Sequence, residues 1–461
     1  MKASLLAGCA AIALAGFCGS AAADTAPGKF DIKIGGDASF TAGHVSQSND
    51  TNTNQTDFTN RFRLQVTPTA HADNGLEYGA NLRIRAWNFN GFVDTDQAYI
   101  FVGGNFGRVE AGVTQGPNNQ YGVTAPSGFG TGGVIGDWAD GPSAFGGSGT
   151  WLTNQTTFLE PVFGGGYNNV TNSNWATRIN YFTPRFFGQG GGDDAAPTGL
   201  MGMLSYAPQN VSVGTGVNRL SYSGTPAQDY CVSGAGAAPA NTSLQGCAYS
   251  NVIEAGLRYD ASFGGVSVAA SFGYEHGDAN PSSAGAAATK YNDLEAYQLG
   301  LQLGYAGFLV GASYLNAGTS GYVKANAAGF DPTSPGLSTT TRLYPSDQSA
   351  ITAGISYETG PVVVGFNYAH GEDAGNLNAP GGRSADLYSV GATYTLAPGF
   401  TTSLEYLHST TNNEARYGTA GNGTDPFGAT SGKTAAPGAL GTVGAGSGNA
   451  DLILWKNVIT F

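Results

Sequence analysis

Residues 57–90 contain the stretch that decides the fold: DFTNRFRLQVTPTAH at 57–71, the turn residues DNG at 73–75, and LEYGANLRIRAWNFN at 76–90. Both long segments alternate with a period of two, which is the repeat of a β-strand. In the first segment one face is apolar (Phe58, Phe62, Leu64, Val66, Ala70), and the other carries Arg61, Arg63, Gln65, Thr67, Thr69 and His71. Two such segments around an Asn-Gly turn predict a β-hairpin with one apolar and one polar face.

The same alternation recurs along the chain and predicts sixteen strands. We expect them near 30–46, 57–72, 76–89, 95–104, 108–115, 174–187, 199–222, 250–261, 265–277, 292–305, 307–316, 347–358, 361–371, 384–396, 399–411 and 449–461. The seventh is interrupted by Pro208, which cannot donate to a strand ladder.

The connections between these strands alternate in length. Short turns, such as 73–75, 105–107, 262–264, 359–360 and 397–399, are interleaved with long loops at 116–173, 223–249, 317–346 and 412–448. Transmembrane β-barrels combine an even strand count with short periplasmic turns and long outer loops. The pattern therefore predicts an all-β fold, a 16-stranded antiparallel transmembrane β-barrel. The stretch 188–198 is long for a periplasmic turn and is interpreted as a local insertion.

The composition supports an all-β chain and argues against a soluble α/β enzyme. Charged residues make up 11% of the sequence, against about 25% in ordinary soluble domains. Glycine accounts for 73 of 461 residues, and aromatic residues for 11%. The sequence has no run of 18 apolar residues that could form a spanning helix. The net charge of −13 argues against a nucleic-acid partner, because such proteins carry basic surfaces.

Residues 1–23 are typical of a secretory signal peptide, which leaves 24–461 as the barrel. Lys2 precedes an apolar stretch over residues 5–17, and three alanines at 21–23 form a small-residue cleavage site. An alternative is a lipoprotein cleavage box at 6–9, which would leave almost no apolar region before it. Cys231 and Cys247 remain after cleavage. In an exported chain we expect them to form a structural disulfide, worth roughly 3 kcal/mol.

The sense of the alternation places the barrel in a membrane. A soluble barrel fills its interior with apolar side chains, but a sixteen-stranded ring is too wide for its Arg, Gln, Thr and Asn residues to fill. The polar face must then line water and the apolar face must meet lipid, with closure satisfying every backbone group. At the end of the chain this assigns Ile453, Trp455 and Ile459 to the lipid face, with Asn457 as the exception.

Inward-facing arginines are the first candidate functional residues. Arg63 is expected nearly opposite Arg85, with Arg61 and Arg83 beside them. Like charges opposite one another destabilise a sheet, so this cluster requires water or facing anions. Arg178 and Arg258 also fall on the polar face of their strands, and together the six arginines are predicted to form a basic, pore-lining wall.

The loop 116–173 is the second candidate, because loops of this length are usually functional or disordered. Its aromatic residues favour an ordered structure, and its acids are Asp137, Asp140 and Glu160. A loop folded into the lumen would place these acids opposite the arginines and create a charged constriction. In the alternative interpretation, the arginines are simply solvated and the loop is an outer cap.

We expect no metal, cofactor or catalytic site. The five histidines show no His-x-x-His or His/Cys spacing, so metal ligation is not indicated. No Gly-x-Ser-x-Gly follows a predicted strand and precedes a helix, as a nucleophile elbow would.

Several segments resemble those of Gram-negative general porins. LEYGANLR at 76–83 resembles their third strand, and AYIFVGGNFGRVEAG at 98–112 resembles a strand, tight turn and strand of that family. INYFTP at 179–184 and EAGLRY at 254–259 are similar to later strands, and GKFDIKIGG at 28–36 resembles the α-proteobacterial branch. The loop departs from the family because it lacks Pro-Glu-Phe-x-Gly, to which EPVFG at 160–164 is only loosely similar. The last strand departs with Ile459 where an aromatic residue is usual.

The resemblance implies a sixteen-stranded barrel in the outer membrane of a Gram-negative bacterium, usually a homotrimer surrounded by lipid. It also implies passive passage of small hydrophilic solutes and ions, and an inward-folded loop facing Arg61, Arg63, Arg83 and Arg85. Three alternatives stay open: a substrate-specific channel for a sugar or anionic solute, an outer-membrane hydrolase, and a purely structural or adhesive barrel. The conflict between the arginine cluster and the acidic total leaves ion preference open.

Overall fold

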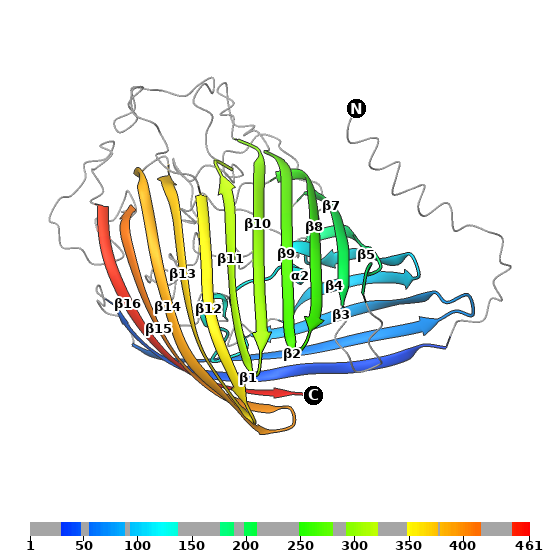
Figure 1. Cartoon of the computed structure of the whole chain (residues 1–461), viewed down its shortest axis with the longest axis horizontal. Helices are drawn as coiled ribbons and strands as arrows, with labels where there is room; N and C mark the ends of the chain where they lie inside the picture. The colour runs from blue at the N-terminus through cyan, green and yellow to red at the C-terminus, as the bar shows by residue number, and fades with distance from the viewer. Residues whose placement is uncertain are drawn as a thin grey trace.

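The computed structural model describes residues 29–47, 55–87, 93–136, 176–188, 198–209, 249–279, 292–320, 348–376, 379–415 and 445–461. These residues form a closed barrel in which each of sixteen antiparallel strands pairs with its neighbours in chain order (Figure 1). Within the described ranges, no helix is long and apolar enough to cross a membrane. The predicted strand count and antiparallel barrel are confirmed.

The strands are β1 (Asp31–Gln47), β2 (Thr56–His71), β3 (Glu77–Trp87), β4 (Val93–Gly104), β5 (Gly107–Thr114), β6 (Ala176–Phe182), β7 (Gly199–Gln209), β8 (Tyr249–Phe263), β9 (Val266–Ala279), β10 (Leu294–Tyr305), β11 (Phe308–Gly318), β12 (Gln348–Thr359), β13 (Val362–Asn376), β14 (Ala379–Ala397), β15 (Phe400–Ala415) and β16 (Ala445–Thr460). Two short helices, α2 (Pro117–Tyr121) and the 3-10 turn η1 (Gly133–Ile135), follow β5.

The β2–β3 hairpin forms in the register that its sequence predicts. Gly75 adopts a left-handed conformation with φ of 82°, which glycine reaches without a Cβ penalty. The turn is closed by the Gly75 amide donating to the Ala72 carbonyl at 2.9 Å. Arg63 then lies directly opposite Arg85.

The barrel closes where the last strand meets the first. β16 pairs with β1 from Asp37↔Thr460 to Gln47↔Ala450. Beyond this ladder, Phe461 exchanges two backbone hydrogen bonds with Gly36, at 2.8 and 3.1 Å. This pairing of the last strand with the first closes the barrel.

The sixth strand ends earlier than its predicted limit at residue 187. β6 stops at Phe182, because Pro184 has no amide hydrogen for a ladder. Pairing resumes only as an isolated bridge between Phe186 and Leu200. β7 is described as far as Gln209; the rest of its predicted range lies outside the described residues.

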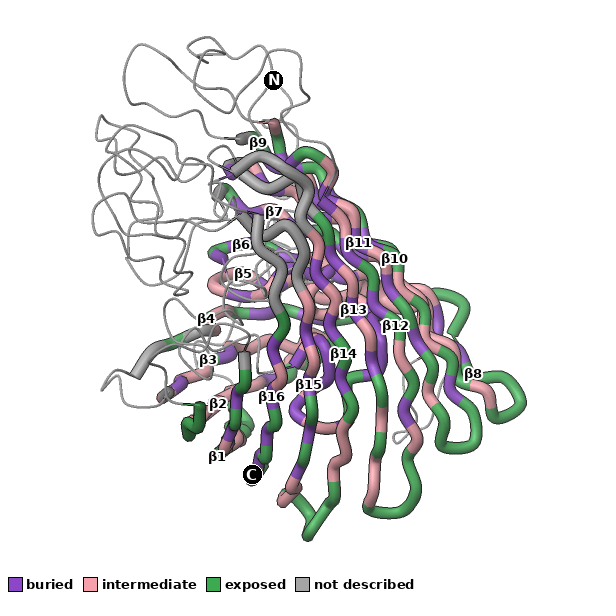
Figure 2. The backbone as a smooth tube through the Cα atoms, turned by 90° about the vertical axis from the view of Figure 1, so that its left-hand side faces the viewer, coloured by how far each residue is buried: buried purple, intermediate pink, exposed green. Residues whose placement is uncertain are grey.

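Exposed and buried residues alternate along most strands, as Figure 2 shows. Large apolar side chains point outward on all sides, including Ile34, Ile100, Leu299 and Trp455. Such an apolar exterior fits lipid, and the predicted alternation is confirmed for most of the ring.

The inner face is not polar throughout, contrary to the simple alternation. Leu387, Leu407, Leu452 and Leu454 of β14–β16 point inward and are about 1% exposed. Together with Val45 and other inward residues they form an apolar cluster, against which Ile135 of η1 packs. The correction has a physical reason: here the interior is covered by a segment of the loop rather than by water alone.

On the outside of the barrel, hydrogen-bonded polar pairs lie near the loop-side ends of several strands. His370 and Tyr368 of β13 both hydrogen bond to Asp386 of β14, at 2.9 Å for the histidine. His408 bonds in the same way to Asp451, at 2.8 Å. On each of these strands, apolar outward residues lie on one side of the pair, such as Val390 beyond Asp386 and Ile453 beyond Asp451. The pairs therefore lie where the apolar band gives way to polar surroundings.

Candidate functional site

Four arginines on β2 and β3 line one side of the interior. Arg61 and Arg63 both contact the Asp37 carboxylate of β1, with N–O distances of 3.3 and 2.6 Å. Arg83 and Arg85 occupy the inward positions of β3, where Arg85 is 5% exposed. The structure therefore brings these four residues together on adjacent strands, where sequence reasoning placed them. We call this set the arginine arc.

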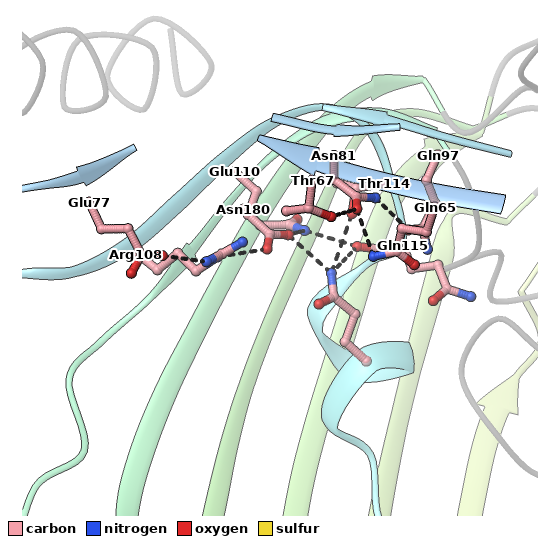
Figure 3. Close-up of polar contacts among 11 residues, drawn as sticks. Gln65, Thr67, Glu77, Asn81, Gln97, Arg108, Glu110, Thr114, Gln115 and Asn180 are labelled. Atoms are coloured by element: carbon pink, nitrogen blue, oxygen red, sulfur yellow. Dashed lines mark hydrogen bonds and ion pairs between the residues drawn. The ribbon is translucent and has the colours of Figure 1, made fainter. Parts of the chain in front are cut away.

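A polar network continues from the arginine arc towards β5 (Figure 3). The Asn81 amide oxygen accepts from Gln65 at 2.7 Å and from Thr67 at 3.0 Å, and its nitrogen donates to Gln97 at 3.0 Å. These bonds satisfy amide groups on three neighbouring strands. The wall beside the arginines is thus held rigidly by side chains that remain neutral.

A second network surrounds the Glu110 carboxylate of β5, also visible in Figure 3. Arg108 donates to it at 3.0 Å, and Gln120 of α2 donates to it at 3.3 Å. Asn180 of β6 and Gln120 both donate to the Gln115 carbonyl, at 2.9 and 2.8 Å. The chain leaving β5 is therefore fastened inside the barrel at its first turn.

Residues 116–136, which we call the strap, follow the inner wall away from β5. Asn118 donates to Glu254 of β8 at 3.4 Å and to the Tyr274 carbonyl of β9 at 3.3 Å. Arg258 of β8 donates to the Tyr121 carbonyl at 3.0 Å. These contacts place the first half of the strap, which begins the predicted constriction loop, in the lumen.

The second half of the strap reaches the far side of the same wall. The Val123 amide donates to Ser271 of β9 at 2.8 Å, and Asn367 of β13 donates to the Pro126 carbonyl at 2.7 Å. The backbone amide and the hydroxyl of Thr131 both donate to Glu405 of β15. The strap is thus bound by strands from β5 to β15, whereas the arginine arc stands on β2 and β3.

Two arginines expected on the pore wall are engaged elsewhere. Arg178 faces inward, but its side chain is 0% exposed and forms an ion pair with Glu254, which is also 0% exposed. Arg258 contacts Asp260 at 2.7 Å besides holding the Tyr121 carbonyl. Arg258 thus holds the strap directly, whereas Arg178 pairs with Glu254, the carboxylate that accepts from Asn118 of the strap. Sequence reasoning missed these roles because they depend on contacts between residues far apart in the chain.

Tyr121 is the one titratable side chain among residues 116–136, and its surroundings shift its pKa. Its ring packs edge-on against Phe182, with centroids 5.2 Å apart. Burial, followed by the negative charge of Glu110, raises the pKa of the Tyr121 hydroxyl above its usual value. The hydroxyl therefore stays protonated throughout the neutral range.

Several predicted residues lie outside the described ranges. These are the loop acids Asp137, Asp140 and Glu160, the pair Cys231 and Cys247, and the signal peptide at residues 1–23.

A family model described as Gram-negative porin matches residues 10–414. The chain belongs to this family. As a member it is an outer-membrane porin of a Gram-negative bacterium, which agrees with its closed barrel and inward strap. Its place in the α-proteobacterial branch stays a prediction.

Solved structures of outer-membrane proteins are similar to the chain at low sequence identity. An anion-selective porin from Comamonas acidovorans is 14% identical, with a TM-score of 0.52, over 94% of this chain and 100% of that one. A loop-deletion mutant of OmpT from Vibrio cholerae is 12% identical over 94% and 99%, with a TM-score of 0.48. A mutant porin from Rh. blastica is 15% identical over 94% and 100%, with a TM-score of 0.47. No curated protein sequence matches the chain.

Proposed function

We propose that this porin passes small hydrophilic solutes and ions by passive diffusion between the strap and the arginine arc. One observation carries the proposal. The strap is bound to strands between β5 and β15, whereas the arginine arc lies on β2 and β3, outside that part of the ring. A loop held against one side of a wide ring leaves the opposite side for water. The aperture is then bounded by neutral amides, guanidinium groups and the strap.

The proposed activity is that of a channel rather than a catalyst. Passage by diffusion requires only a width and a lining charge, and neither involves a nucleophile or a proton transfer. The buried carboxylates Glu254 and Glu405 are explained by their bonds to the strap. The four arginines of the arginine arc and the three loop acids remain proposals as selectivity residues. Arg178 and Arg258, predicted together with them, are instead proposed to position the strap.

The arginine arc gives the aperture wall a local positive charge. Asp37 contacts two of its members, at 2.6 Å from Arg63 and 3.3 Å from Arg61. Four guanidinium groups on two adjacent strands favour anions near the wall, although the whole chain carries −13. An anionic solute or a sugar as a dedicated substrate is therefore the second candidate function.

We further propose a homotrimer in outer-membrane lipid, the usual assembly of general porins. Family membership supports this proposal. Chemical cross-linking of the detergent-extracted protein should then give a three-subunit band.

Swelling of proteoliposomes in sugars of increasing size separates the two candidate functions. Passive diffusion predicts rates that fall smoothly with solute size and rise linearly with solute concentration. A substrate-specific channel predicts saturation by one solute and competition between solutes. If vesicles containing the folded barrel swell no faster than empty vesicles, the proposed channel function is wrong.

A further inference from the structure

Glycines occupy the inner wall at six places where the strap crosses it. They are Gly256 of β8, Gly273 of β9, Gly300 of β10, Gly311 of β11, Gly365 of β13 and Gly391 of β14. Glycine weakens the interior of a strand, and its presence there often marks close approach by another backbone. Two pairs even lie directly opposite each other, Gly256↔Gly273 and Gly365↔Gly391.

At each of these glycines, a Cβ atom would meet the strap. At Gly300 it would lie 2.6 Å from the Val123 carbonyl carbon and nearer still to the oxygen. At Gly311 it would lie 2.9 Å from the Thr124 carbonyl oxygen. Real Cβ atoms essentially never approach another heavy atom within 3.0 Å, so any side chain here requires the strap to move into the lumen.

Phe129 of the strap lies in the depression formed by the paired glycines of β13 and β14. Its side chain is 1% exposed. A Cβ on Gly365 would be 2.6 Å from the Phe129 Cγ and nearer to two other ring atoms, and one on Gly391 would be 3.3 Å from the ring. All three of the atoms nearest to Gly365 belong to this one ring.

Polar contacts on both sides keep the ring in that depression. Asn367 donates to the Pro126 carbonyl at 2.7 Å, and Thr393 donates to the Gly130 carbonyl at 3.4 Å. The strap backbone is therefore held three residues before and one residue after Phe129. These bonds keep the segment that carries the ring against β13 and β14.

We propose that Phe129 and the glycine pair Gly365–Gly391 form a socket that sets the distance of the strap from the wall, and so the free cross-section of the pore. Phe129 acts as a positioning residue, and Gly300 fulfils the same purpose halfway along the strap. The inference rests on the proposed function, because it identifies what determines the width of that channel.

The socket makes a prediction about size complementarity that general stability does not. Gly365→Ala places a methyl group where the ring lies and pushes the strap towards the arginine arc. Phe129→Ala removes the ring atoms that cause this clash, so the double variant has room for both alanines. The loss of conductance in Gly365→Ala should therefore be partly corrected by Phe129→Ala, a change that by itself only removes packing atoms.

Single-channel conductance in planar bilayers, with exclusion of uncharged polymers of graded size, tests the socket. Heat-modifiability gels first confirm folding. The comparison then covers five proteins: wild type, Gly365→Ala, Phe129→Ala, the double variant and Gly103→Ala. Gly103 is the matched control, because it also lies in the barrel wall and a Cβ there meets nothing closer than 3.7 Å.

We expect Gly365→Ala to lower the conductance and the exclusion size, and the double variant to regain part of both. Phe129→Ala alone adds no clash and should flicker between conductance levels, which keeps the test valid even if Gly365→Ala does not fold. Equal, quiet conductance in all folded variants would overturn the socket while leaving the porin function intact. A silent wild type would instead overturn the proposed function.

Discussion

Removing Arg178 should destabilise the barrel far more than removing an arginine of the pore wall. Arg178 and Glu254 form an ion pair in which both side chains are 0% exposed. Glu275, also 0% exposed, lies directly opposite Glu254, and among the described residues neither of its carboxyl oxygens has a hydrogen-bond partner. The Arg178→Ala change therefore leaves two buried carboxyl groups side by side without a guanidinium group.

The size of the effect follows from this burial. Breaking a buried ion pair by removing one partner costs about 3–5 kcal/mol, because the remaining charge stays desolvated. At about 1.4 kcal/mol per factor of ten, the folding equilibrium should fall by roughly two to nearly four orders of magnitude. Arg63→Ala is the control. Both side chains of its contact with Asp37 are partly exposed to solvent, and Asp37 keeps its contact with Arg61, so the expected loss of folding free energy is below about 1 kcal/mol.

Urea titration of the protein folded in lipid vesicles, followed by tryptophan fluorescence, measures both losses. Adding Glu275→Gln to Arg178→Ala should restore part of the stability, since it replaces one of two adjacent buried carboxyl groups by a neutral amide of the same shape. The reasoning fails if Arg178→Ala unfolds at the same urea concentration as Arg63→Ala. It fails equally if Glu275→Gln makes no difference in the Arg178→Ala background.

Three further predictions test the wall, a turn and the strap. Arg83→Glu should shift the reversal potential in a KCl gradient towards that of potassium, because it reverses one charge of the arginine arc. Lys33→Glu makes the same charge change at the start of β1, outside the arginine arc, and should shift the reversal potential less. Gly107→Ala should lower the free energy of unfolding in urea by at least about 1 kcal/mol, since Gly107 has a φ of 106° and a Cβ there would overlap the Phe182 carbonyl; an unchanged urea midpoint would contradict this. Because the pKa of Tyr121 is raised by folding, its stabilising contribution is complete below the unfolded-state pKa of about 10 and is lost as pH rises through the folded-state pKa. In thermal melts between pH 9 and 12, Tyr121→Phe should lack this loss of stability. A parallel loss in both proteins would refute the prediction.

The features that depend on neighbouring strands could be predicted from the sequence. Arg63 faces Arg85 because the Asn74–Gly75 turn fixes the register of a hairpin and the period of two fixes the face. The closure of the barrel through Phe461 follows from the same periodicity. These relations are local or involve consecutive strands, so a single sequence contains them.

The features that depend on the strap could not be predicted in the same way. Arg178 occupies an inward position like the pore-wall arginines, and only the fold shows that Glu254 and α2 enclose it. The inward leucines of β16 have a signal in the sequence: DLILW, at 451–455, is apolar on both faces, which indicates a strand covered on both sides. The interior glycines of β8–β14 also indicate close approach, but not which segment approaches.

Single-channel recording of the purified wild-type protein in planar bilayers, with the reversal potential in a KCl gradient, tests the central claim most directly. An aperture between the strap and the arginine arc predicts discrete, long-lived conductance steps that increase in proportion to KCl concentration. The four guanidinium groups further predict a reversal potential displaced towards that of chloride relative to the Arg83→Glu variant. A protein that inserts as a folded barrel yet conducts nothing above the bare bilayer would contradict the account.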